Sequence, residues 1–189
     1  QTREIGKDAS STADALKRAS SHRDPRVAMA CADALGRVSG RPAASIPALV
    51  SASSSSDPGV RAEAVRRIGA LQKDGRGASK TLVERGEDPD PKVRAAATIA
   101  LALVGVRGEE LLGALERRLG EPEPEVRIAA AAAAAHAREE ARPLLATLGR
   151  MKDDPEPRVA AATSAACDAI EGKEPPKAPA LIPVPAPPA

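Results

Sequence analysis

The chain of 189 residues contains no Phe, Tyr, Trp or Asn. A core without aromatic rings buries little apolar area per residue, so we expect closely packed helices that touch through small side chains. The absence of Asn excludes N-linked glycosylation, because the acceptor motif begins with Asn. No run of about 18 apolar residues occurs, and this excludes a transmembrane helix within the sequence.

An excess of charge of one sign is also missing. The sequence has 28 basic and 26 acidic residues, a formal net charge of +2. The charges are interspersed, so no net field attracts the chain to nucleic acid, and a nucleic-acid partner is not expected.

The sequence does contain a repeat. Its valines and leucines recur at a fixed step of 33 residues in two series. The valine series is Val27, Val60, Val93, Val126 and Val159, and the leucine series is Leu16, Leu49, Leu82, Leu115 and Leu148. Two series in one unbroken register indicate five copies of a single structural unit.

Each unit also carries a helix-start signal. An acidic residue stands three positions before each valine of the series and is followed by proline. An acid at the N-cap accepts hydrogen bonds from free backbone amides, and proline at the first helical position has no amide to lose. The pairs are Asp24 and Pro25, Asp57 and Pro58, Asp90 and Pro91, Glu123 and Pro124, and Glu156 and Pro157.

These patterns predict an all-α fold, an α-solenoid of helix pairs. We expect a polar lead-in or cap over residues 1–10 and an extended proline-rich tail over 173–189. Between them the predicted repeats cover residues 11–172, at about 11–40, 41–74, 75–107, 108–140 and 141–172.

The phrase from Asp57 to Arg61, with Ala64, Ile68 and Gly69, and its echo from Pro91 to Ala97 resemble the HEAT-like repeats of bacterial proteins, including the type found in phycobilin lyases. The resemblance covers residues 11–171 and implies a binding scaffold. It also implies that the arginine one position after the valine braces neighbouring repeats as an inter-repeat ladder, with an anion-binding row as the alternative. This arginine is present as Arg61, Arg94 and Arg127, whereas repeats one and five have Ala28 and Ala160.

No arrangement of residues indicates catalysis. His22 and His136 lie more than three repeats apart, and Cys31 and Cys167 four repeats apart, so neither pair can share a metal or a disulfide. We therefore predict no catalytic residue, cofactor, metal or small-molecule substrate. Carboxylates recur in pairs before each helix start, and we interpret them as caps and solvated loop charges. They are Asp88, Asp90, Glu121, Glu123, Asp154 and Glu156.

Two features point to a protein partner. The first is the second helix of repeats three and four, which is apolar also on the face opposite the valine, where HEAT-like arrays have their concave surface. A helix that is apolar all round is usually buried all round, so this face predicts a binding groove, although Ala can also serve as a helix former on an exposed face. The predicted groove residues are Ala95, Ile99, Ala102, Ile128, Ala131, Ala132 and Ala135.

The second feature is the tail, where seven prolines from Pro175 onward favour an extended polyproline II segment. At about 3.1 Å per residue the tail from Pro175 to Ala189 could reach roughly 45 Å, and Leu181, Ile182 and Val184 form its apolar centre. We expect it to bind either the chain's own groove or the groove of a neighbouring copy.

The sequence thus favours a non-enzymatic scaffold that assembles end to end into a filament, with contacts through repeats one and five and with the tail clasping the next copy. The alternative is a monomeric adaptor that binds a different protein in its groove, and a chromophore-lyase-like enzyme comes third. The chain begins at Gln1. This start fits a cleaved signal peptide or a trimmed chain, and of these we favour export to the periplasm or the extracellular space over a cytoplasmic location.

Overall fold

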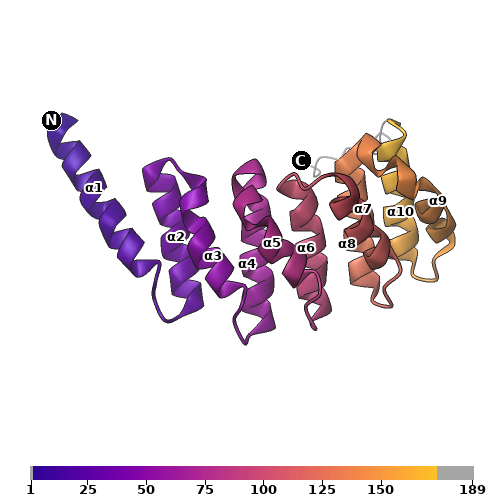
Figure 1. Ribbon diagram of the computed structural model, residues 1–189, viewed down its shortest axis with the longest axis horizontal. Coiled ribbons are helices and arrows are strands. Elements are labelled where there is room, and N and C mark those ends of the chain that lie inside the picture. The colour runs from indigo at the N-terminus through magenta and orange to yellow at the C-terminus, as the bar shows by residue number, and fades with distance from the viewer. Residues whose placement is uncertain (1, 174–189) are drawn as a thin grey trace, which may run out of the picture.

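The computed structural model describes residues 2–173, with the side chains of residues 11–173, and within this range all regular secondary structure is helical. The helices follow one another along the long axis of the molecule, which is an α-solenoid (Figure 1). They are α1 (Thr2–Ala19), α2 (Pro25–Ser39), α3 (Ile46–Ala52), α4 (Pro58–Ala70), α5 (Ser79–Arg85), α6 (Pro91–Leu103), α7 (Gly108–Leu119), α8 (Pro124–Ala137), α9 (Leu145–Arg150) and α10 (Pro157–Ile170).

The predicted helix starts are confirmed, since α2, α4, α6, α8 and α10 all begin at the proline of the repeated phrase. The preceding acid caps four of these helices by accepting a backbone N–H, as Asp57 does from Gly59 and Val60. Glu123 is the exception, because its carboxylate accepts from Arg94 of the previous repeat instead of capping α8.

The N-terminal lead-in is not separate from the first repeat. Residues 2–10 are helical and continue without a break into the rest of α1. Gly6 lies inside this helix. A single glycine lowers helix stability by only about 1 kcal/mol, so it does not by itself end the helix.

The second helices form one continuous layer. α4, α6, α8 and α10 pack side by side, and each also packs on the shorter first helix of its own pair. Three of the first helices are short because glycine or proline keeps the preceding segment in a 3-10 turn. These turns are η1 (Pro42–Ser45), η2 (Gln72–Ala78) and η3 (Arg138–Leu144), and a further turn, η4 (Met151–Asp153), follows α9.

The core lies between the two layers, and the two repeated series form much of it. Leu49, Leu82, Leu115 and Leu148 are fully buried, and so are Val93, Val126 and Val159, with Val60 at 2% exposure. The first repeat differs. Leu16 is only half-buried, and Val27 is 40% exposed.

The exposure of Val27 reflects how the first helix pair joins the solenoid. α2 packs on α1, α3 and η1 but touches α4 over only a few residues, unlike the later second helices. In Figure 1, α1 leans away from the rest of the array. The α2 positions equivalent to the later core therefore form an uncovered stripe, which consists of Val27, Cys31, Ala34 and Val38.

The two cysteines are free thiols in different environments. Cys167 is buried, and burial raises its pKa. Cys31 is only half-buried, because it belongs to the uncovered stripe of α2. Among the helices that the structure describes, none is long and apolar enough to cross a membrane.

Candidate protein-interaction surfaces

Arg61 connects two repeats. Its guanidinium donates two hydrogen bonds of 2.8 Å to the carboxylate of Asp88, which lies 27 residues further along in the next repeat. Its remaining nitrogen, Nη1, donates to the carbonyl oxygens of Ser55 and Ser56, in the loop that leads into its own helix. One side chain thereby holds a loop of one repeat against a loop of the next.

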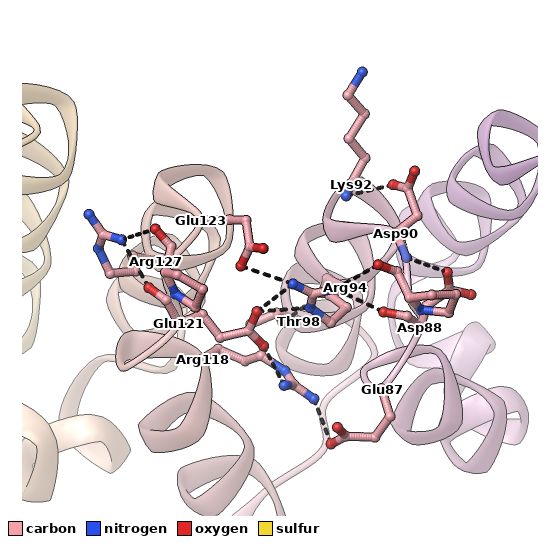
Figure 2. Close-up of polar contacts among 12 residues, drawn as sticks. Glu87, Asp88, Asp90, Lys92, Arg94, Thr98, Arg118, Glu121, Glu123 and Arg127 are labelled. Atoms are coloured by element: carbon pink, nitrogen blue, oxygen red, sulfur yellow. Dashed lines mark hydrogen bonds and ion pairs between the residues drawn. The ribbon is translucent and has the colours of Figure 1, made fainter.

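The same arrangement recurs at the next two joints. Arg94 donates to the carbonyl oxygens of Asp88 and Pro89 and to the carboxylates of Glu121 and Glu123 (Figure 2). Arg127 donates to the carbonyl oxygens of Glu121 and Pro122 and makes a two-bond contact with the carboxylate of Asp154, again 27 residues away. We call these three arginines with their acidic partners the arginine ladder, and each joint a rung.

The acidic partners correct one expectation from the sequence. Asp88, Glu121 and Asp154 are not solvated loop charges, because their side chains are only 1%, 13% and 10% exposed. Two of them also close the local turn before the next helix, since Asp88 accepts from the amide of Asp90 and Asp154 from that of Glu156. A buried carboxylate needs a partner of opposite charge, and the ladder arginine is that partner.

The ladder acids are ionised at neutral pH. Burial is the largest single influence on the pKa of Asp88 and raises it, but hydrogen bonds from Arg61 and from the amide of Asp90, together with the positive charges of Arg61 and Arg85, outweigh burial. The pKa of Asp88 therefore lies below its ordinary value of 3.8. Burial also raises the pKa of Glu121, but hydrogen bonds from Arg94 and Arg118 overcome this effect, and the pKa is lowered. For Asp154 the hydrogen bond from Arg127 is the main cause of a lowered pKa.

Sequence reasoning missed a second arginine at two rungs. Arg118 at the end of α7 is buried and contacts Glu121 at 2.5 Å and Glu87 at 2.6 Å (Figure 2). Arg85, 33 residues earlier, holds the same place beside Asp88 at 3.6 Å and donates to the carbonyl oxygen of Ser53. The signal in the sequence is an arginine three residues before the ladder acid.

An apolar groove lies over the layer of second helices, on α4, α6 and α8. Its volume is about 380 Å³, and alanines, two isoleucines and a leucine form most of its lining. Ile99 is 37% exposed there, which is unusual for so large an apolar side chain in this protein. The lining residues are Arg66, Gly69, Lys92, Ala95, Ala96, Ile99, Ala100, Leu103, Glu125, Ile128, Ala129 and Ala132.

Four of the seven predicted groove residues, Ala95, Ile99, Ile128 and Ala132, line this groove. Ala102 and Ala131 do not, because they are buried in the core, and Ala135 is partly buried against it.

The reason is the helical register. Ala102 lies eight residues after Arg94, and Ala131 four after Arg127, so both lie on the side of the helix from which the ladder arginine reaches the next repeat. The following second helix covers that side. The predicted tail residues, Leu181, Ile182 and Val184, lie outside the described residues.

The side chains of residues 11–173 include no group of three or more His, Cys, Asp or Glu that could hold a metal ion. His22 lies in the loop before α2 and His136 in the last turn of α8, and the structure does not bring them together.

The stacked helix pairs and the ladder between them define a repeat protein of the α-solenoid class. The family model of HEAT repeats matches residues 12–102 and 79–167, which is most of the chain. The chain belongs to the HEAT repeat family.

A solved structure is similar in fold. It is the crystal structure of an engineered protein from the Northeast Structural Genomics Consortium. The similarity has a TM-score of 0.56 at 21% sequence identity and covers 85% of this chain and 79% of that one. No curated protein sequence matches the chain.

Proposed function

We propose that the protein is an interaction scaffold whose apolar groove on α4, α6 and α8 binds an extended apolar segment of a protein chain. The observation that carries this proposal is the exposure of Ile99 beside Ile128 in a groove with an alanine floor. Covering such side chains removes apolar area from water, which is the main source of affinity in protein association.

The dimensions of the groove suit a short segment. About 380 Å³ accommodates a few aliphatic side chains, not a whole helical domain. Arg66, Lys92 and Glu125 line the groove, and Arg66 pairs with Glu63. Charges of both signs are therefore present, and charge selects no strongly acidic or basic ligand there.

The segment that we propose for the groove is the apolar centre of the C-terminal tail, Leu181, Ile182 and Val184. Its prolines restrict the free chain to extended conformations, so binding costs less conformational entropy than for an ordinary peptide. Docking onto a neighbouring copy would link molecules, and docking onto the same copy would close the groove. A segment of a different protein is the alternative occupant.

Self-assembly is the second candidate, and the uncovered stripe of α2 favours it. Val27 and Val38 are 40% and 47% exposed at the first repeat. The later repeats bury the equivalent of Val27, so a neighbouring copy that covers this stripe would extend the core from one molecule to the next.

The test is a titration of a chain that ends at Glu174, labelled at its isoleucine methyl groups, with a peptide of residues 178–189, because the tail of the full chain would compete with the peptide for the groove. We expect the NMR signals of Ile99 and Ile128 to shift with an apparent Kd of roughly 0.1–1 mM, while buried Ile68 stays unchanged. Signals that do not move at several millimolar peptide would reject the tail as occupant.

A matched pair of variants controls for nonspecific effects. Ile99→Glu introduces a charge in the groove, and Val83→Glu introduces the same charge at a valine that is 36% exposed on the first-helix layer. Only Ile99→Glu should abolish the shifts. Light scattering of the full chain against concentration separates the remaining cases, because docking between copies raises the mean mass and docking within one copy does not.

A further inference from the structure

A cavity larger than the apolar groove lies at the joint between the first two repeats. It has a volume of about 960 Å³, and residues from the end of α1, from α2 and from α3 line it. In Figure 1, α1 leans away from the array at this joint. Its position separates it from the apolar groove, which begins at α4.

Basic side chains surround this cavity, and no carboxylate lines it. We call the cavity the basic cleft. All of its basic side chains and its histidine are exposed. They are Lys17, Arg18, His22, Arg23 and Arg41.

These cations are not neutralised by neighbours. Among the side chains of residues 11–173, no carboxylate pairs with Lys17, Arg18, Arg23 or Arg41, whereas the ladder arginines all have acidic partners. The chain as a whole is nearly balanced in charge, with a net charge of +2. The cleft is therefore a local concentration of positive charge in a protein that has little net charge overall.

His22 adds a hydrogen-bond donor. Its Nδ1 accepts the backbone N–H of Asp24 at 3.0 Å, which places the proton of the neutral ring on Nε2. The ring therefore has its Nε2–H available as a donor to the cleft.

The floor of the cleft is apolar. Ala28, Ala48 and Ala52 are buried at its base, and Leu35 is half-buried beside them. A ligand that fits both the basic rim and the apolar floor carries negative charges around an aliphatic group. The cleft offers no aromatic ring on which a nucleic-acid base could stack, because the chain has none.

The missing rung explains why the cleft is open. Ala28 stands where the later joints have a ladder arginine, and its methyl group leaves the space at the base of the cleft unfilled. Ser55 stands where they have a ladder acid, so this joint also lacks the carboxylate that would neutralise nearby cations.

We propose that the basic cleft binds an acidic peptide segment, with Asp or Glu residues flanking an aliphatic side chain. The carboxylates pair with Arg18, Arg23 and Arg41 at the rim, and the aliphatic side chain contacts the floor near Leu35. This second site is independent of the groove on α4, α6 and α8, and it remains if the tail does not bind there.

Fluorescence anisotropy tests the proposal with the full chain and a fluorescein-labelled peptide of four Glu-Leu-Asp units. A Gln-Leu-Asn peptide of equal length is the neutral control. We expect the acidic peptide to bind at least about tenfold more tightly at 50 mM salt, and its affinity to fall as salt is added. Equal affinity for the two peptides, or no binding of either at millimolar protein, would overturn the proposal.

Variants locate the binding site. The double charge reversal Arg18→Glu with Arg41→Glu should weaken binding by about tenfold or more. The control, Arg138→Glu with Arg150→Glu, makes the same change of charge at exposed arginines far along the solenoid and should have a much smaller effect. Equal losses in both would show attraction to net charge only and contradict a site, provided that circular dichroism shows all variants folded.

A single-stranded oligonucleotide of equal charge is the competitor. Displacement of the peptide at equal or lower concentration would assign the cleft to nucleic acid and overturn the proposal. Failure to compete would support recognition of the peptide's aliphatic groups.

Discussion

Ala28 and Ser55 hold, at the first joint of the solenoid, the positions that Arg61 and Asp88 hold one repeat later. The later pair is joined by two hydrogen bonds of 2.8 Å and is nearly excluded from solvent. Ala28 and Ser55 cannot form an ion pair. Ser55 only closes the local turn before the next helix, because its hydroxyl oxygen accepts the amide N–H of Asp57.

The missing rung predicts that the first repeat opens independently of the others. In repeat arrays, stability depends on the contacts between neighbours, and α2 has few with α4. In native-state hydrogen exchange, peptides from α2 should exchange faster than peptides from α6. Equal protection of the two helices would show that the whole array opens as one unit and would contradict this prediction.

Loss of a rung should destabilise the array more than loss of an exposed ion pair. Arg61→Met leaves the carboxylate of Asp88, 4% exposed as a residue, without its main partner, and should lower the free energy of unfolding by about 2–3 kcal/mol. Arg26→Met removes an ion pair with Asp57 that is largely exposed, and should leave the denaturation midpoint nearly unchanged.

Urea denaturation measures both variants. Adding Asp88→Leu to Arg61→Met should restore part of the loss, because the unpaired charge is then gone. If Arg26→Met were as damaging as Arg61→Met, burial would not be what makes the rung important.

The ladder also predicts a loss of stability in acid. The pKa of Asp88 is lower in the folded chain than its ordinary value of 3.8. A carboxyl group with a lowered folded pKa contributes stability above its unfolded pKa and loses that contribution as the pH falls through the folded value. The stability difference between the unmodified chain and Asp88→Asn should therefore be constant near neutral pH and shrink below about pH 4.

Asp153→Asn is the matched control, because Asp153 is exposed in the turn beside a different rung. In urea titrations its effect on stability should be small, because its exposed side chain has no ladder arginine as a partner. A pH-independent difference for Asp88→Asn would show that the ion pair with Arg61 does not stabilise the fold.

Two glycines should respond to alanine in opposite directions. A methyl group at Gly75 would lie 2.5 Å from the carbonyl oxygen of Ile68 and 3.0 Å from a methyl group of Val104, so Gly75→Ala should destabilise by about 2 kcal/mol. Gly149 lies in α9 with nothing within 4 Å of such a methyl group, so Gly149→Ala should stabilise by about 0.5–1 kcal/mol. Thermal unfolding measures both, and a destabilised Gly149→Ala would contradict the second prediction.

The repeated features were predictable because each depends on residues close in sequence. The acid and proline before each second helix define its start, and the 33-residue step places Leu82 and Val93 in the core. The arginine positions are also visible in the sequence, and the carboxylate 27 residues after each one is a second local signal of a rung.

Features that depend on neighbouring repeats were harder to predict. Val27 and Val60 look alike in the sequence, but only Val60 is buried, because burial depends on how α1 and α2 join the array. Ala131 and Ala132 differ by one residue, yet α10 packs on the side of α8 that carries Ala131 and leaves Ala132 exposed. The basic cleft brings together α1, the loop after it and the start of repeat two, which no single motif connects.

The spacing of the ladder has a consequence for how such a chain can change in length. Each ladder arginine finds its partners five and six residues before it and 27 residues after it. Duplicating the 33-residue unit of repeat three or of repeat four, each of which carries both a ladder acid and a ladder arginine, would leave every existing arginine with a partner at the same spacing and add one new joint. Growth by whole units therefore needs no compensating substitution, whereas a deletion of a few residues between Arg94 and Glu121 would disrupt two repeats at once.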